Sequence, residues 1–145
     1  MLINLAFGIK FDLEAIEKRI AVPIVRLLGL VEFRCKNRWS APYNVIIDTG
    51  SPISVFPSYI QKEADIRVLF ETKISGLVPD EKATLRASLS RLTFRIGDKE
   101  RVTAPIESHA YITDTDKIPL ILGFSDILNC ELKINYRNKK ASLLF

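Results

Sequence analysis

The sequence of 145 residues is poor in histidine and cysteine, with one histidine and two cysteines. A Ser-His-Asp or Cys-His catalytic site would have to use His109, yet no Gly-x-Ser-x-Gly motif accompanies it. Cys35 and Cys130 are too few for a disulfide framework or a metal-binding knuckle, and we expect two buried free thiols. The same scarcity argues against a zinc site formed by protein side chains.

The sequence also lacks long apolar runs. No uncharged run approaches the roughly 20 residues that a membrane span needs. The apolar opening of residues 1–7 is short and has no basic stretch before it, so it is unlike a signal peptide. We therefore expect a cytoplasmic protein with no membrane partner.

Long blocks of one charge are absent as well. The net charge is +4, with acidic and basic residues mixed along the chain. Arg137, Lys139 and Lys140 cluster at a predicted hairpin turn, but a charged turn is normally just solvated. We expect no nucleic-acid partner and keep nucleic-acid binding as a third alternative only.

Strand-like segments dominate what is present, and the apolar fraction of 48% suits one folded core. Short runs rich in Val, Ile, Leu, Thr and Phe lie between turn residues. They predict strands over residues 22–33, 44–47, 67–74, 84–96 and 106–112, and a closing hairpin with arms at 132–134 and 141–145. We expect one mainly β domain over residues 22–145, preceded by an extension of residues 1–21 whose role is open.

Two short helices are expected beside these strands. Asp12 can cap a turn or two in which Leu13, Ile16 and Ile20 recur at helical spacing. Ser125 can cap a second short helix that runs to residue 128.

The segment over residues 44–51, Asn-Val-Ile-Ile-Asp-Thr-Gly-Ser, carries the chemistry. An apolar strand locked in the core fixes the position of Asp48, which follows it. Gly50 allows a sharp turn and brings its N–H toward the carboxylate with no Cβ in the way. Thr49 offers a hydroxyl for a bond across an interface, and Ser51 offers one that can reach the carboxylate. The pattern predicts a carboxylate held by donors at the edge of a core.

A single carboxylate is a poor catalyst of peptide hydrolysis, because amide hydrolysis needs one group to accept a proton and another to donate one. Two facing carboxylates meet this need by sharing one proton, as in the general case of the aspartic protease dyad. The nearest second motif, residues 114–116, reads Asp-Thr-Asp and lacks the glycine. The second carboxylate must therefore come from another copy of the chain across a two-fold axis.

Three segments in this order resemble the retropepsins, a family that includes the retroviral proteases. The first is the catalytic strand and turn at residues 45–51. The second, Ile-Ser-Gly-Leu at 74–77 with the strand-like 83–86, is similar to the family's flap hairpin. The third, Pro-Leu-Ile-Leu-Gly at 119–123 with the short helix after it, is similar to the family's apolar segment that ends in glycine.

This resemblance implies a closed retropepsin-like β-barrel with one short C-terminal helix, acting as an obligate homodimer without metal or cofactor. The implied activity is that of an aspartic endopeptidase, whose water lies between two Asp48 carboxylates and whose substrate is a peptide or protein. Thr49 would bond across the dimer axis and Gly50 would bond the substrate backbone. The implied site residues are Asp48, Thr49 and Gly50 for catalysis, and Ser51, Ser75, Gly76 and Leu77 for substrate binding.

Some positions depart from the family pattern. Pro52 stands where many retroviral members carry an acidic residue, and Phe124 follows Gly123 where an arginine is common. The flap carries Pro79, Asp80, Glu81 and Lys82 where the family has a run of glycines. The extension before residue 22 either adds a strand to the dimer interface or blocks the cleft. The alternative function is therefore a non-catalytic dimerisation or peptide-binding module that keeps the fold.

Overall fold

The protein is mainly β, as expected from the sequence. A computed structural model describes residues 1–77 and 84–145. Its strands are β1 (Leu2–Phe11), β2 (Pro23–Cys35), β3 (Arg38–Trp39), β4 (Tyr43–Ile47), β5 (Ser54–Phe56), β6 (Arg67–Ser75), β7 (Thr84–Gly97), β8 (Ile106–Thr113), β9 (Ile121–Leu122), β10 (Glu131–Asn135) and β11 (Lys140–Leu144). The helices within these residues are α1 (Leu13–Glu17), α2 (Tyr59–Glu63) and α3 (Phe124–Ile127). No helix in the described ranges is long and apolar enough to cross a bilayer.

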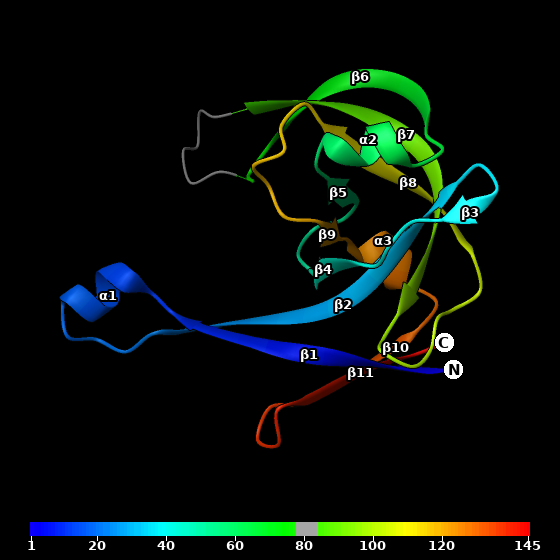
Figure 1. Ribbon diagram of the computed structural model, residues 1–145. Coiled ribbons are helices and arrows are strands. Elements are labelled where there is room, and N and C mark those ends of the chain that lie inside the picture. The colour runs from blue at the N-terminus through cyan, green and yellow to red at the C-terminus, as the bar shows by residue number, and fades with distance from the viewer. Residues whose placement is uncertain (78–83) are drawn as a thin grey trace.

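All the strands join one sheet, in the order β10-β11-β1-β2-β4-β9-β5-β8-β7-β6, with β3 paired to β2 (Figure 1). The long strand β2 uses different parts of its length for different neighbours. Its first half pairs with β1 and its middle with β4, while residues 30–33 pair with the end of β7. This last pairing brings β7 back to β2, so that the sheet curls around its own side chains.

The core inside this curled sheet is built on three aromatic rings. Phe33 on β2, Phe56 on β5 and Phe94 on β7 are almost fully buried. Their ring centroids lie 5.1, 6.4 and 6.2 Å apart in edge-on arrangements, which aromatic pairs favour. Strands from three parts of the sequence therefore share one apolar centre.

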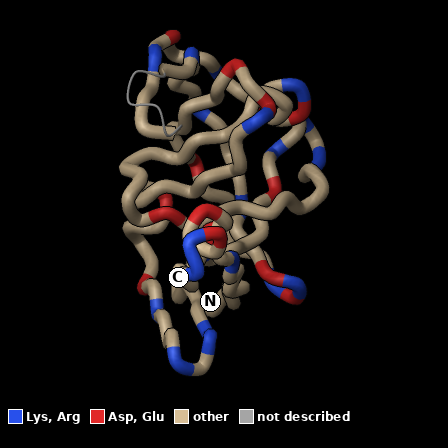
Figure 2. Tube along the Cα trace, turned by 90° about the vertical axis from the view of Figure 1, so that its left-hand side faces the viewer, with Lys and Arg blue, Asp and Glu red and all other residues tan. Residues whose placement is uncertain are grey.

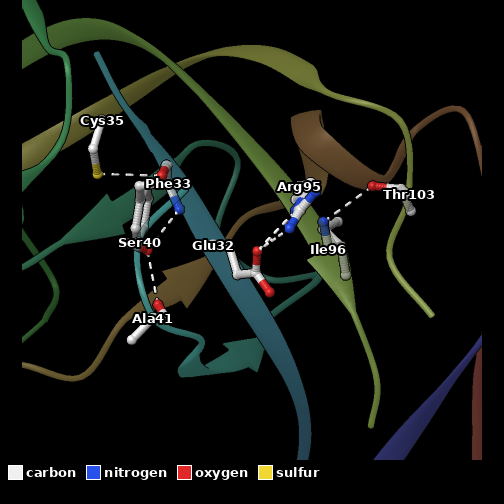
Figure 3. A network of polar contacts seen from close by, with 8 residues as sticks. All are labelled: Glu32, Phe33, Cys35, Ser40, Ala41, Arg95, Ile96 and Thr103. Atoms are coloured by element: carbon white, nitrogen blue, oxygen red, sulfur yellow. Dashed lines mark hydrogen bonds and ion pairs between the residues drawn. The ribbon is translucent and has the colours of Figure 1, made fainter. Parts of the chain in front are cut away.

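Polar contacts fasten β2 to its neighbours at the same end of the molecule (Figure 3). The Arg95 guanidinium on β7 donates to Glu32 Oε2 on β2, with an Nε–Oε2 distance of 2.8 Å. Ile96 N–H donates to Thr103 Oγ1 at 3.0 Å, and Phe33 N–H donates to Ser40 Oγ at 3.0 Å. The two hydroxyls accept from backbone N–H groups, and Arg95 with Glu32 links β7 to β2, so the curl is held by hydrogen bonds as well as by packing.

The predicted strands and the closing hairpin are confirmed to within about three residues at each end. Asp12 caps α1 as expected, since its Oδ1 accepts from Ala15 N–H at 2.8 Å. The cap of α3 was predicted wrongly, because the helix begins after Gly123 and contains Ser125. Both predicted helices are present, as α1 and as the one short helix near the C-terminus, α3, whereas α2 was not predicted.

Both cysteines are free, and Cys35 is buried as predicted. Cys130 is only half-buried, which corrects the expectation for that residue. Burial raises the pKa of each thiol, so both stay protonated and weakly nucleophilic near neutral pH.

Residues 2–11, part of the expected N-terminal extension, form β1 and pair within the chain. Residues 2–5 pair with β11 and residues 6–11 with β2. Ile3 is fully buried and Leu5 nearly so, both in the same core cluster as Phe33. Phe145 N–H also donates to the Met1 carbonyl at 2.9 Å, so the first and last residues lie together.

Replacing Ile3 with alanine is expected to lower the free energy of unfolding by about 2–5 kcal/mol, because it leaves a cavity in the core. The matched control is Ile134→Ala on β10, where 53% of the side chain is exposed and the expected change is within about 0.5 kcal/mol. Urea unfolding followed by tryptophan fluorescence measures both. Equal effects would show that β1 adds nothing to the core.

Candidate active site

Asp48 stands at the end of a strand that is held on both sides. β4 pairs antiparallel with β2 and parallel with β9, and Val45 and Ile47 on it are buried. The Asp48 N–H donates to the Leu122 carbonyl at 3.0 Å, continuing the ladder by one residue. The backbone of Asp48 is thus fixed by the sheet, while its side chain is half-buried.

The residues after Asp48 form a turn around its carboxylate. Gly50 N–H donates to Asp48 Oδ1 at 2.9 Å, as the sequence predicted. A Cβ on Gly50 would lie 3.2 Å from the same oxygen, so glycine allows this close approach. Ser51 N–H donates to the Asp48 carbonyl at 3.3 Å and closes the turn.

The Ser51 hydroxyl does not bind the carboxylate. It donates to the Ile53 carbonyl at 2.8 Å, which corrects the expectation that it reaches Asp48. Thr49, which follows Asp48 directly, is exposed. Three of the expected site residues therefore surround Asp48, with one backbone donor on its carboxylate.

The segment of residues 123–125, here named the brace, is hydrogen-bonded to the end of this turn. A Cβ on Gly123 would lie 2.4 Å from the carbonyl carbon of Ile53, closer than real contacts allow. The absence of a side chain lets Phe124 N–H donate to the Ser51 carbonyl at 2.7 Å and Ser125 N–H to the Pro52 carbonyl at 3.1 Å. The first and third segments of the family resemblance thus meet, backbone to backbone.

A cluster of polar side chains lies behind the brace. Gly123 N–H donates to Ser54 Oγ at 2.8 Å, and the Ser54 hydroxyl in turn donates to the Asp126 carboxylate. Burial raises the pKa of Asp126, although hydrogen bonds from Ser108 and Ser54 act in the opposite direction. Three segments of the chain are therefore tied through one half-buried carboxyl group.

The second segment of the resemblance lies over the same region. β6 and β7 pair up to Ser75 and Thr84, and Gly76 follows with φ +86°, a conformation that favours glycine. Leu77 and Ile74 pack on a small buried cluster of Val55, Ile118 and Ile121. Since Ile121 on β9 is opposite Ile46 on β4, the end of β6 lies against the strand next to the one that leads to Asp48. The expected tip of the flap, residues 78–83, lies outside the described residues.

Other features of the described residues lie apart from Asp48. His109 is exposed on β8. A surface hollow of about 580 Å³ lies among α2, β6, β7 and β8. No group of three or more His, Cys, Asp or Glu side chains that could hold a metal ion occurs in the two described ranges.

No protein-family model and no curated protein sequence matches the chain. Among solved structures, it is similar to the EIAV protease complexed with the inhibitor HBY-793. The TM-score is 0.47 at 21% sequence identity, over 72% of this chain and 86% of that one. A likeness at this level concerns the course of the chain and says nothing of catalysis.

Sequence reasoning missed the cluster of Ser54, Ser108 and Asp126. The three residues are far apart in the sequence, and each is of a type that is usually exposed. No local pattern marks them, because what unites them is the pairing of β5 with β8 and the packing of α3 on β5.

Replacing Gly123 with alanine is expected to lower the free energy of unfolding by about 1–3 kcal/mol or more, because the new Cβ collides with backbone that cannot swing away. Gly8→Ala is the matched control, since its nearest contact is the end of the Leu28 side chain at 3.3 Å. Urea midpoints compare the two. A Gly123 variant as stable as the Gly8 variant would contradict the brace.

The raised pKa of Asp126 predicts a pH dependence of stability. A folded state that holds this proton more tightly than the unfolded state is favoured at low pH, and the advantage is lost as pH rises through the folded pKa. Asp126→Asn removes this titration, so the variant should gain stability relative to the wild type between pH 3 and pH 7. Melting temperatures across that range measure the difference, and a difference independent of pH would contradict the assignment.

Proposed function

We propose that the protein is an aspartic endopeptidase of the retropepsin type, in which two copies of the chain each supply Asp48. The observation that supports this most is the carboxylate at the end of a core strand, with Gly50 N–H on one oxygen and a brace beneath its turn. Such a rigid mount gives a reacting group a fixed position, which is the protein's main contribution to a hydrolytic site.

The mechanism requires two carboxylates that face each other. Like charges a few ångströms apart cannot both ionise, so the pair holds one proton between them. The ionised Asp48 takes a proton from the bound water as it attacks the peptide carbonyl carbon, and the protonated Asp48 gives its proton to the carbonyl oxygen. The resulting tetrahedral intermediate collapses with proton transfer to the leaving amine. Thr49 follows each Asp48 and is exposed, and in the proposed dimer its hydroxyl would bond across the two-fold axis.

An extended peptide would lie between the Asp48 turn and the β6–β7 hairpin. Main-chain hydrogen bonds to Ser51, Ser75 and Gly76 would add the peptide as a strand, with affinity from the backbone and selectivity from pockets for alternate side chains. Leu77 belongs to an apolar cluster, so selectivity should favour apolar side chains. A closed barrel beneath the cleft is supported by the β2–β7 pairing, which completes a circuit of strands.

Asp48→Asn should lower the rate of cleavage of an unfolded protein substrate by at least about a hundredfold between pH 3 and pH 7, because one partner of the acid–base pair is lost from each copy. Asp114→Asn is the matched control, since this exposed aspartate belongs to the nearest similar tripeptide. Mixing excess Asp48→Asn copies with wild-type copies should also lower the activity per wild-type chain. A site complete within one chain would leave that activity unchanged.

Other outcomes would decide between the alternatives. Cleavage that survives Asp48→Asn would reject the mechanism. Binding of an extended peptide without cleavage by the wild type would favour the non-catalytic module. Salt-dependent retention on DNA that is lost when Arg137, Lys139 and Lys140 are neutralised would favour nucleic-acid binding.

A further inference from the structure

The β1–β2 ribbon has one face that begins in the core and continues, still apolar, outside it. Along β1, Ile3 is 0% exposed and Leu5 is 7% exposed, while on the same face Ile9 and Phe11 are 40% and 51% exposed. The residues opposite on β2 share this face and are also apolar: Leu27 faces Phe7, Val25 faces Ile9, and Pro23 faces Phe11. The apolar residues of this face thus continue beyond the point where the rest of the chain covers them.

The uncovered part of the ribbon passes the Asp48 turn. β4 ends at Ile47, which is opposite Leu27, and β2 extends beyond that point by residues 23–26. Asp48 leaves β4 at this same end. Residues 7–27, here named the arm, therefore project from the body on the side of the candidate site, with α1 at the tip (Figure 1).

The tip of the arm is apolar and exposed as well. No side chain of α1 is buried, and Leu13, Ile16 and Ile20 are 77%, 49% and 56% exposed. Together with the exposed residues of the ribbon, they present on the order of 600 Å² of apolar surface, the upper end of what a monomer normally leaves uncovered. Such a surface indicates a partner.

We propose that the arm is a clasp that packs against a second copy of this chain, beside that copy's Asp48 turn. This inference rests on the proposed function, because a two-fold axis between two Asp48 residues places the partner's body beyond the end of β4, where the arm runs. Two arms together present about 1,200 Å², the lower bound of a stable interface. The arm thereby adds a surface to the dimer that the Asp48 turn alone does not provide.

The second copy also offers a suitable surface. Phe124 and Leu128 on and after α3 are 47% and 60% exposed, and Phe124 is hydrogen-bonded to the Asp48 turn through the Ser51 carbonyl. In the proposed dimer this apolar pair, next to the Asp48 turn, is the surface that the partner's arm would cover.

The charge of the arm favours a protein surface over a lipid surface. Residues 7–27 hold three acidic and four basic side chains, which are Asp12, Glu14, Glu17, Lys10, Lys18, Arg19 and Arg26. The basic polar face typical of helices that lie on membranes is therefore missing from the arm. Figure 2, viewed from the side toward which the arm projects, shows acidic and basic residues interspersed.

The test uses the full chain carrying Asp48→Asn, so that assembly is measured without proteolysis. Sedimentation velocity from about 1 to 100 µM should show a dimer whose dissociation constant rises about tenfold or more with Phe11→Asp or Ile16→Asp, as for apolar residues at the centre of an interface. Ile134→Asp is the matched control, with similar exposure on β10, and should dimerise like the parent. Melting temperatures show that each variant is folded.

The possible failures can be told apart by adding a cleavage assay on the same variants with Asp48 restored. Arm variants that dimerise and cleave normally would overturn the clasp and leave the proposed function standing. Dimers that depend on the arm but show no Asp48-dependent cleavage would support the clasp and reject the function. A chain that stays monomeric but binds phosphatidylcholine–phosphatidylglycerol vesicles through Phe11 would overturn the clasp in favour of a lipid surface.

Discussion

The close approach of Gly123 to the backbone of Ile53 is the contact on which the arrangement of the site depends. A methyl group there would separate β9 from β5, and β9 lies between β5 and β4 in the sheet. With the two backbones in contact, the hydroxyl of Ser54 accepts from Gly123 N–H and the Leu122 carbonyl accepts from Asp48 N–H. Asp48 is therefore positioned by a glycine 75 residues further along the chain, through the pairing of β9 with β4.

Local features of the sequence were enough to predict the frame of this site. The apolar strand before Asp48 and the glycine after it have their roles within a few residues of each other, and the structure confirms both the strand and the Gly50 donor. The same holds for the Asp12 cap and the closing hairpin, where each signal lies within one turn of its effect. Such features can be predicted from the sequence because the hydrogen bonds and backbone conformations that produce them involve residues only a few positions apart.

The features that were missed depend on contacts between distant segments. Nothing near Ser51 indicates that its hydroxyl would choose the Ile53 carbonyl over Asp48, since that choice follows from the brace beneath the turn. Likewise, the role of Asp126 becomes visible only once Ser54 and Ser108 are brought to it by the sheet. The cap of α3 is Gly123 and not the predicted Ser125, and this too depends on a distant contact. Phe124 N–H, at the start of the helix, donates to the Ser51 carbonyl.

The pairing of β1 with β11 has a consequence for biosynthesis. The ladder from Leu2↔Leu144 to Leu5↔Ala141 joins segments separated by almost the full length of the chain. On a ribosome, Ile3 emerges before its partner strand β11, which follows on the order of ten seconds later at ordinary translation rates. During that interval β1 lacks β11 on one side, so this part of the sheet closes only after residues 140–144 have emerged, and the apolar side chains of β1 are exposed to chaperones or to misfolding until then.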